Sequence, residues 1–198
     1  MATIGVLALQ GDFREHMMAL RRLNCRSIEV RLPAHLEEID GLVIPGGEST
    51  TIGKLLVQFG LLEPLREKIL RGFPVYGTCA GLILLAKDIG GLDQPLLGVM
   101  DIKVQRNAFG RQVDSFEADI PMPALGHEPF HVVFIRAPKI LSVGPDVEVI
   151  GQLADGTIVA VRQGNLLGSA FHPELTNDSR FHGLFLQMVE GAQSLSSR

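Results

Sequence analysis

The sequence Val75-Tyr76-Gly77-Thr78-Cys79-Ala80-Gly81 joins an apolar, strand-like segment to the apolar, helix-like run Leu82-Ile83-Leu84-Leu85-Ala86. A residue on a sharp strand-to-helix turn projects its side chain away from the backbone, and small neighbours let the chain turn tightly. The N-terminus of the following helix favours the thiolate form of a cysteine. The pattern therefore predicts a nucleophile at Cys79, against the alternative of a buried structural cysteine.

Strand-like and helix-like segments alternate on the N-terminal side of this junction and up to about residue 87. Nearly unbroken apolar runs are typical of strands buried on both faces, and apolar residues at helical spacing are typical of amphipathic helices. Strands are predicted at residues 3–9, 27–32, 41–44 and directly before Cys79, and helices at residues 13–23, 49–59, 61–70 and 82–86. This alternation indicates a doubly wound parallel sheet with helices on both faces.

The second half of the chain is richer in strands. Strands are predicted at residues 97–105, 113–120, 132–136, 147–153, 158–162 and 166–171, with a hairpin turn at 163–165, a closing amphipathic helix at 181–189 and a loose tail at 194–198. The fold prediction is thus a three-layer α/β architecture: a doubly wound, mostly parallel sheet with helices on both faces and an antiparallel extension. Residues 1–198 are interpreted as a single domain.

Composition narrows the class of protein. The 198 residues are 46% hydrophobic and 20% charged, which describes a globular chain, and the net charge of −4 without a basic run gives no reason to expect a nucleic-acid partner. Two cysteines at no regular spacing argue against a disulfide framework or a zinc site. The start of the chain lacks the basic region of a signal peptide, and the apolar runs are too short to cross a bilayer. We therefore expect a cytoplasmic protein without membrane contact.

A candidate base lies far downstream of Cys79. His172 follows the predicted strand at 166–171, and ligands of open α/β sheets bind beyond the carboxyl ends of strands. Glu174 stands two residues further on, and in an extended segment residues i and i+2 project to the same side. Glu174 is therefore expected to orient His172, as the third member of a triad does. The three residues predict a Cys-His-Glu hydrolase, against a structural role for a lone histidine.

A glycine-rich loop supplies the third element. Pro45-Gly46-Gly47-Glu48-Ser49 follows the predicted strand at 41–44; alone it reads as a plain turn, but such glycines can aim backbone N–H groups at an oxyanion. The amides of Gly47 and Ala80 are the expected pair of donors. The remaining histidines show no metal-ligand spacing and are assigned to surface or core positions: His16, His35, His127, His131 and His182. No metal or organic cofactor is required.

These motifs carry a family resemblance that extends from the first strand to the last helix. PVYGTCAG at residues 74–81 and FHPE at 171–174 resemble the class I, or triad, glutamine amidotransferases. A narrower set of motifs resembles the glutaminase subunits of pyridoxal 5′-phosphate synthase: LALQGD at 7–12, PGGESTT at 45–51, RNAFGRQVDSFE at 106–117 and FIRAP at 134–138. The motifs of the class are moderately specific, whereas the loop PGGEST at 45–50 and the stretch at 106–117 are highly specific.

The resemblance implies an activity and a set of residues. It makes Cys79 the nucleophile, His172 the base and acid, and Glu174 its orienting partner in the hydrolysis of L-glutamine. The residues that it places around glutamine are Gly47, Glu48, Ser49, Arg106, Ile135 and Arg136. From spacing alone, Arg106 and Arg136 read as solvated or structural charges. The resemblance also implies a partner, the (β/α)-barrel synthase subunit, in a large hetero-oligomeric complex in which the glutaminase is weak until docked.

Three alternatives stay open at this point. The first is a glutaminase subunit of another synthase, such as imidazole glycerol phosphate synthase, which the motif at 106–117 argues against. The second is a cysteine hydrolase that acts alone on γ-glutamyl compounds. The third is a catalytically idle binding subunit, which the presence of Cys79, His172 and Glu174 disfavours.

Overall fold

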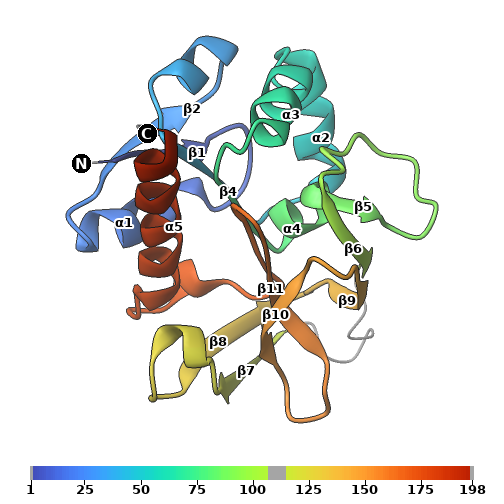
Figure 1. The fold of residues 1–198 in the computed structure, drawn as a ribbon. Helices are drawn as coiled ribbons and strands as arrows, with labels where there is room; N and C mark the ends of the chain where they lie inside the picture. The colour runs from blue at the N-terminus through green and yellow to red at the C-terminus, as the bar shows by residue number, and fades with distance from the viewer. Residues whose placement is uncertain (1, 107–114, 197–198) are drawn as a thin grey trace.

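The fold is built around a ten-stranded sheet, seen in a computed structural model that describes residues 2–106 and 115–196 (Figure 1). The strands of this sheet are β1 (Thr3–Leu7), β2 (Arg26–Val30), β3 (Gly41–Ile44), β4 (Val75–Thr78), β5 (Ala86–Asp88), β6 (Met100–Gln105), β9 (Lys139–Val143), β10 (Glu148–Gln152), β11 (Ile158–Gln163) and β12 (Leu166–Ser169). Their spatial order is β2-β1-β3-β4-β12-β11-β9-β6-β5, and β10 pairs with β11. A separate antiparallel ribbon consists of β7 (Ser115–Ile120) and β8 (Phe130–Ile135).

The sheet changes character at β12. From β2 to β12 all neighbouring strands are parallel, whereas β11, β9 and β6 follow in antiparallel pairs. The helices are α1 (Phe13–Arg22), α2 (Ser49–Gln58), α3 (Leu62–Leu70), α4 (Ala80–Leu85) and α5 (Arg180–Ser196), with short 3-10 turns η1 (Pro33–Glu37), η2 (Pro123–Leu125) and η3 (Pro173–Leu175). The parallel half therefore comes from the part of the chain in which strands and helices alternate, plus β12.

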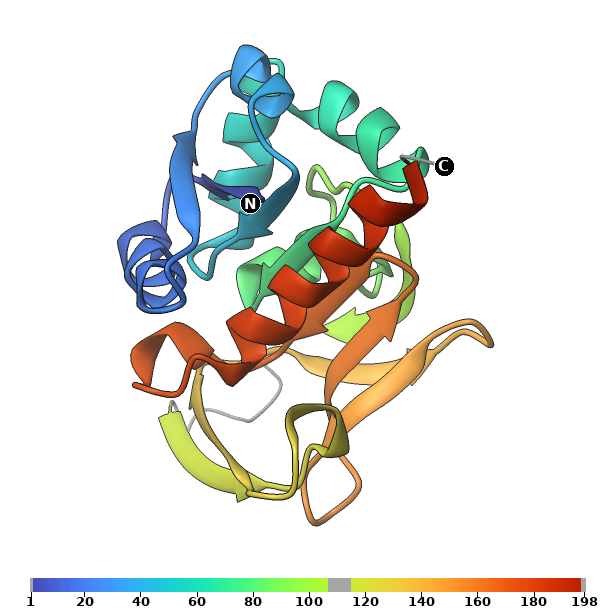
Figure 2. The same cartoon turned by 60° about the vertical axis from the view of Figure 1, so that its left-hand side comes forward.

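Two successive residues of β4 show that helices cover both faces of the sheet. The buried ring of Tyr76 meets His16 of α1 and Phe181 of α5, at centroid distances of 6.2 and 5.4 Å. Gly77 faces the opposite side, where a Cβ would lie 2.5 Å from the carbonyl carbon of Gly81 in α4. Successive strand residues point to opposite faces, so α1 and α5 lie on one side and α4, with α2 packed against it, on the other. Figure 2 shows α5 running along its side of the sheet.

The parallel register brings four loops to one edge. The carboxyl ends of β1, β3, β4 and β12 all lie at the same edge, since neighbouring parallel strands run in the same direction. Residues 8–12, 45–48, Cys79 and 170–172 continue directly from these four ends. Segments that are far apart in the sequence are thereby placed together, and the functional site is built from them.

The predicted architecture is confirmed, while several element boundaries differ. The chain has the expected three layers and antiparallel extension, but the strand β9 was not predicted, because its residues contain no clear alternation and it is held by pairing with β6 and β11. The predicted helix at 82–86 ends at Leu85, because Ala86 is extended (ψ 141°) and begins β5. The predicted loose tail is wrong for residues 194–196, which continue α5.

One predicted strand and one predicted motif extend beyond the described residues. Of the predicted strand at 113–120, β7 covers residues 115–120, while residues 107–114, most of the specific motif at 106–117, lie outside the described residues.

In the described part of the chain, no helix combines the length and apolar character needed to cross a membrane.

The junction around Cys79 predicts a strict requirement for glycine. A Cβ at position 81 would lie 2.1 Å from the carbonyl oxygen of Ile44, and one at position 77 would lie within 2.6 Å of the Gly81 backbone. Gly77→Ala and Gly81→Ala should each lower the free energy of unfolding by about 1–3 kcal/mol or more, as overpacking does. Gly183→Ala is the control: Gly183 lies in α5, and outside its own helix backbone and chain neighbours no atom lies within 4 Å of its Cβ position.

Chemical denaturation measures the effect. The control should be neutral or more stable by about 0.5–1 kcal/mol, because alanine is the better helix former. Equal stabilities for the Gly81→Ala variant and the control would contradict the close packing of α4 on β3.

Candidate functional site

Cys79 occupies a strained backbone position between β4 and α4. Its φ of 48° and ψ of −100° lie outside the regions that residues with a Cβ ordinarily adopt. The conformation is held from both sides: the Cys79 amide donates to the carbonyl of Ser169 at 2.8 Å, and its own carbonyl accepts from Ile83. Its side chain lies in the largely buried floor of the loop-lined edge, with 7% of the residue exposed. This is the projecting turn that the glycine-flanked sequence predicts.

His172 and Glu174 form the predicted pair. The His172 amide donates to the carbonyl of Val133 in β8, and its Nδ1 lies 2.6 Å from Oε1 of Glu174. Both residues are buried. The route to this pairing differs from the prediction, because Glu174 lies in the 3-10 turn η3 and not in an extended segment. The turn still returns the carboxylate to the imidazole, since the side chain of Glu174 is long enough to reach back over one residue.

The electrostatics of this pair favour a charged imidazole. Burial opposes protonation of His172, but hydrogen bonds to Cys79 and Glu174 and the charges on both groups outweigh it and raise its pKa to about 10. Burial also raises the pKa of Glu174, an effect that contact with His172 counteracts. Asp12 places a second carboxylate oxygen 3.8 Å from His172 Nδ1. A protonated His172 beside Cys79 is the arrangement that a thiolate nucleophile needs.

The two loops beside Cys79 are joined by hydrogen bonds. The amide of Asp12 donates to the carbonyl of Gly46 at 3.1 Å, and the amide of Glu48 donates to Oε1 of Gln10 at 2.9 Å. A Cβ on Gly46 would lie 2.4 Å from Cε1 of His172, so only glycine fits there. Because the Gly46 carbonyl points at Asp12, the N–H of Gly47 in the same trans peptide points the opposite way.

A cavity of about 460 Å³ opens above Cys79. The residues that line it are Gln10, Gly11, Asp12, Gly47, Glu48, Ser49, Cys79, Ile83, Arg106, Ile135, Arg136 and His172. All six residues expected around glutamine are among them. Two other predicted site residues are not: Ala80, which follows Cys79 in the chain, is buried, and Glu174 is buried in contact with His172.

Glu48 is both a helix cap and a charge at the cavity wall. Its carboxylate accepts from the amides of Thr50 and Thr51 at the start of α2, and it pairs with Arg106 at 3.0 Å. Burial acts against ionisation, but the hydrogen bonds from Thr51 and Thr50 outweigh it and lower the Glu48 pKa to about 2. Glu48 therefore presents a fixed negative charge, and Arg106 a positive one beside it.

The comparison with known proteins agrees with this geometry. The sequence matches the model of the SNO glutamine amidotransferase family over residues 6–191. The chain belongs to this family. Two relatives are the pyridoxal 5′-phosphate synthase subunits PdxT of Moorella thermoacetica, 61% identical over 186 residues, and of Chloroflexus aurantiacus, 56% identical over 191 residues. The matches cover 94% of this chain in both cases, and 98% and 100% of the relatives.

Solved structures extend the comparison to the fold. A crystal structure of a glutamine amidotransferase matches with a TM-score of 0.90 at 52% identity, covering 94% of this chain and 98% of that one. PurLQS from Thermotoga maritima matches over the full length of both chains with a TM-score of 0.68 at 16% identity, which shows a shared fold alone. The predicted activity, glutamine hydrolysis by an amidotransferase, is confirmed by the family.

One residue of this glutamine amidotransferase site had no sequence signal. Gln94 Oε1 accepts hydrogen bonds from Arg106 at 2.8 Å, Thr50 at 3.1 Å and Ser49 at 3.2 Å. It lies in an irregular segment between β5 and β6 that belongs to no motif. Gln94 thus positions Arg106 against α2, and only the folded chain shows this role.

Metal-capable atoms occur at the amidotransferase site. Ligand atoms of Asp12, His172 and Glu174 lie within 4.8 Å of one another. The Nδ1 of His172 is already engaged with Glu174, and a metal bound there would break the orienting contact of the triad. The donor set therefore fits proton transfer better than metal binding.

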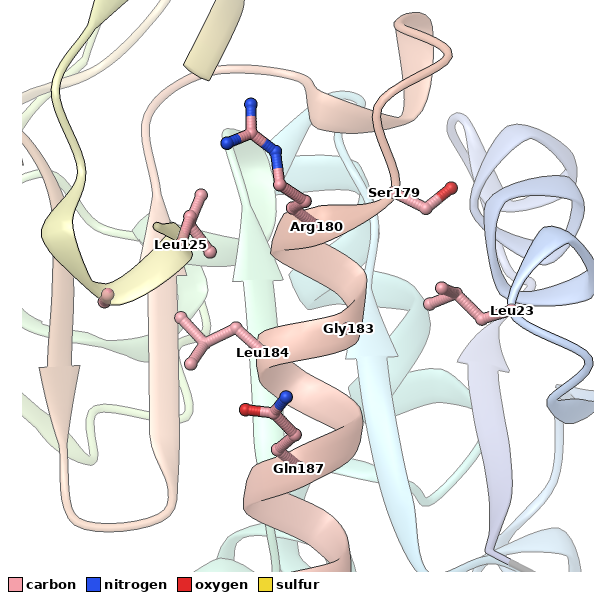
Figure 3. A pocket seen from close by; sticks show the side chains of 8 residues that line it. Leu23, Leu125, Ser179, Arg180, Gly183, Leu184 and Gln187 are labelled. Atoms are coloured by element: carbon pink, nitrogen blue, oxygen red, sulfur yellow. The ribbon is translucent and has the colours of Figure 1, made fainter. Parts of the chain in front are cut away.

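A second cavity of about 390 Å³ lies beside α5 (Figure 3) and shares no lining residue with the cavity above Cys79. Its lining residues are Leu23, Ala124, Leu125, Ser179, Arg180, Gly183, Leu184 and Gln187. Its one charged group, Arg180, is already bound by Asp178 and by the carbonyls of Glu128 and Pro129. This cavity therefore offers no unpaired charged side chain, whereas the cavity above Cys79 is lined by several charged groups.

The strained backbone predicts an unusual order of stabilities. Cys79→Gly should be more stable than Cys79→Ala by about 1–3 kcal/mol, because glycine adopts this conformation without the strain that a Cβ imposes. Cys25 is the matched control, since it is buried, forms no disulfide and does not have a positive φ. There the glycine variant should be the less stable one, because glycine has the more flexible unfolded chain. Urea denaturation of the four variants measures this, and the same order at both positions would contradict the strain.

The raised pKa of His172 predicts its titration. In the wild-type chain the imidazole should keep its proton until the pH approaches about 10, well above the ordinary 6.5. In Cys79→Ala the midpoint should move to lower pH, because the hydrogen bond and charge of the sulfur are lost while Glu174 remains. Histidine NMR signals report both titrations, with Cys25→Ala as the control. An unchanged His172 midpoint in Cys79→Ala would refute the coupling.

Proposed function

We propose that the chain hydrolyses L-glutamine through Cys79, His172 and Glu174 and passes the ammonia to the synthase subunit of pyridoxal 5′-phosphate synthase. The observation that carries the proposal is the constellation at the strand edge: a strained Cys79 and a His172 that Glu174 orients line the same cavity, which has charged walls. The names of relatives at 56–61% identity support the choice of acceptor.

The proposed reaction has two steps. The Cys79 sulfur attacks the carboxamide carbon of glutamine, and the negative charge moves onto the carbonyl oxygen, where the N–H groups of Gly47 and Ala80 act as donors. The C–N bond then breaks, His172 gives its proton to the departing nitrogen, and ammonia leaves a γ-glutamyl thioester. His172 next removes a proton from water, which attacks the thioester carbon. The C–S bond then breaks, so glutamate leaves and the Cys79 sulfur is restored beside a protonated His172.

The charged wall of the cavity fits the two ends of glutamine. An amino acid carries a carboxylate and an ammonium group, and the cavity offers Arg106 and Arg136 on one hand and Glu48 on the other. Arg136 adopts a positive φ of 43° directly after β8, which turns the backbone of Ile135 and Arg136 at the cavity rim. Gly47, Ser49 and Ile135 complete the proposed contacts through backbone and small polar groups.

A partner is chemically useful because ammonia loses its nucleophilicity when it is protonated in water. A docked acceptor enzyme, expected here as a (β/α)-barrel synthase subunit in a large complex, receives it before that happens. The loops 10–12 and 45–51 are proposed to couple docking to assembly of the oxyanion site. Their hydrogen bonds between Asp12 and Gly46 and between Gln10 and Glu48 support a linked movement. We further expect a single domain over 1–198, a cytoplasmic location, no cofactor and no nucleic-acid or membrane partner.

The test is a glutaminase assay with and without the synthase subunit that reads both glutamate and pyridoxal 5′-phosphate. We expect weak hydrolysis by the chain alone, a marked increase in the complex, and product formation only there. Cys79→Ala should reduce glutamate release to background, because loss of a triad nucleophile removes nearly all catalysis, and Cys25→Ala should not.

Each other result has a definite meaning. Equal rates with and without the partner would refute the docking proposal and favour a hydrolase that acts alone. Stimulated hydrolysis without pyridoxal 5′-phosphate would point to another acceptor, such as imidazole glycerol phosphate synthase. Activity in Cys79→Ala would refute the triad.

A further inference from the structure

Two histidines form a buried pair behind the triad. His16 of α1 and His182 of α5 each have 0% exposure, and Nδ1 of His16 lies 2.9 Å from Nε2 of His182. The sequence gives neither of them a role. The polar atoms of a buried imidazole need hydrogen-bond partners, so the partners of these two rings indicate which groups the pair keeps in position.

His16 connects the pair to both halves of the triad. Its Nε2 lies 3.0 Å from Oγ1 of Thr78, the residue before the nucleophile, and 3.5 Å from Oε2 of Glu174. Oε1 of Glu174 faces His172, while Oε2 is buried without a hydrogen-bond partner among the described residues. His16 Nε2 is thus placed to donate a hydrogen bond to Oε2 of Glu174. Catalytic hydrogen bonds are often long in an unliganded site and tighten in the complex with substrate.

The donors and acceptors around His16 and His182 favour one tautomer of His16. If its Nε2 carries the proton, it donates toward Thr78 and Glu174, while Nδ1 accepts from Nε2–H of His182. His182 Nδ1, which is buried without a partner, is then only an unused acceptor. In the opposite arrangement, His182 Nδ1 would be an orphaned N–H donor and Glu174 Oε2 would face no donor. The first arrangement leaves fewer groups unsatisfied.

Both rings are held neutral. Burial, together with the neighbouring His182 and His172, lowers the pKa of His16 well below its ordinary value, and burial with the charge of Arg22 lowers the pKa of His182 to about 4. A neutral His16 offers Glu174 an N–H without a second positive charge, so the carboxylate keeps its full attraction for the imidazolium of His172.

We propose that His16 is a positioning residue of the triad: its Nε2–H holds the second carboxylate oxygen of Glu174, and His182 fixes the tautomer that makes this possible. The proposal rests on the triad assigned above and adds a fourth and a fifth member to the chain of contacts, Cys79–His172–Glu174–His16–His182. His16 touches neither the cavity nor the reacting atoms.

Other titratable or charged groups face this region. Asp12 lies 3.8 Å from His172 Nδ1 on the cavity side, and Arg22 contributes positive charge near His182. Tyr76 hydrogen-bonds Ser169 at 2.9 Å, and burial raises its pKa well above its ordinary value, so it stays neutral. None of these groups provides a donor to Oε2 of Glu174, which leaves His16 as the described side chain in position to do so.

The decisive variants are His16→Leu and His16→Gln. Leucine removes the donor, whereas the amide nitrogen of glutamine takes about the place of Nε2. In the presence of the synthase subunit, His16→Leu should lower kcat about 10–100-fold, the size of effect seen when a supporting hydrogen bond of a site is lost. KM for glutamine should stay within about twofold, because His16 does not line the cavity. His16→Gln should recover most of the loss.

The pH profile separates positioning from simple destabilisation. With Glu174 less firmly held, the imidazolium of His172 is less stabilised, so the basic limb of kcat/KM should move to lower pH in His16→Leu. His182→Leu should show a smaller shift in the same direction, because the His16 tautomer is no longer fixed. Leu20→Ala is the control: Leu20 is equally buried in α1, and its truncation should lower the melting temperature without moving the limb.

A second readout needs no activity and no partner. Alkylation of Cys79 by iodoacetamide, located by mass spectrometry in the isolated full chain, reports the reactivity of the sulfur beside His172. At one fixed pH it should slow in His16→Leu and not in Leu20→Ala. A wild-type profile in folded His16→Leu, or equal losses in His16→Gln and His16→Leu, would overturn the proposal. Cys79→Ala, assayed alongside, shows separately whether the triad itself is wrong.

Discussion

The site depends on the close approach of α4 to the end of β3. Because Gly81 has no Cβ, the first turn of α4 packs directly on the Ile44 carbonyl, and this contact holds Cys79 in a conformation that it would not adopt alone. The same contact sets the nucleophile beside the loop that follows β3, where Gly46 meets His172. Strain at one residue is thus maintained by tight packing around it, as is common at active sites.

The ionisable groups beside Cys79 contact one another in series. Cys79 and Glu174 together raise the pKa of His172, and the buried Glu174 stands between that cation and the neutral His16. Glu174 thus contacts His172 at 2.6 Å and His16 at 3.5 Å, and a buried polar network of this kind restricts the positions of its members. On the solvent side, Glu48 and Arg106 are fixed by the start of α2 and by Gln94, so the cavity walls are ordered before glutamine arrives.

Much of this was predictable from local patterns, and the failures share a cause. Alternating strands and helices, the glycines around Cys79 and the polar residues after each strand predicted the fold and the triad. The strand β9 was missed because its pairing with β6 and β11, not its own composition, makes it a strand. Gln94 and His16 were missed because their partners are distant in sequence: Gln94 meets Ser49, and His16 meets Glu174.

The sequence alone determined the class of fold and the resemblance that pointed to glutamine, and it predicted the nucleophile, its base and the residue that orients the base. Those inferences rest on local chemistry: a turn that only small residues permit, and side chains at strand ends. Only the tertiary structure decided that Glu174 reaches His172 from a 3-10 turn, that Asp12 locks onto Gly46, and that two histidines from α1 and α5 meet behind the triad. Such contacts join segments up to 166 residues apart, and no local pattern encodes a distance between them.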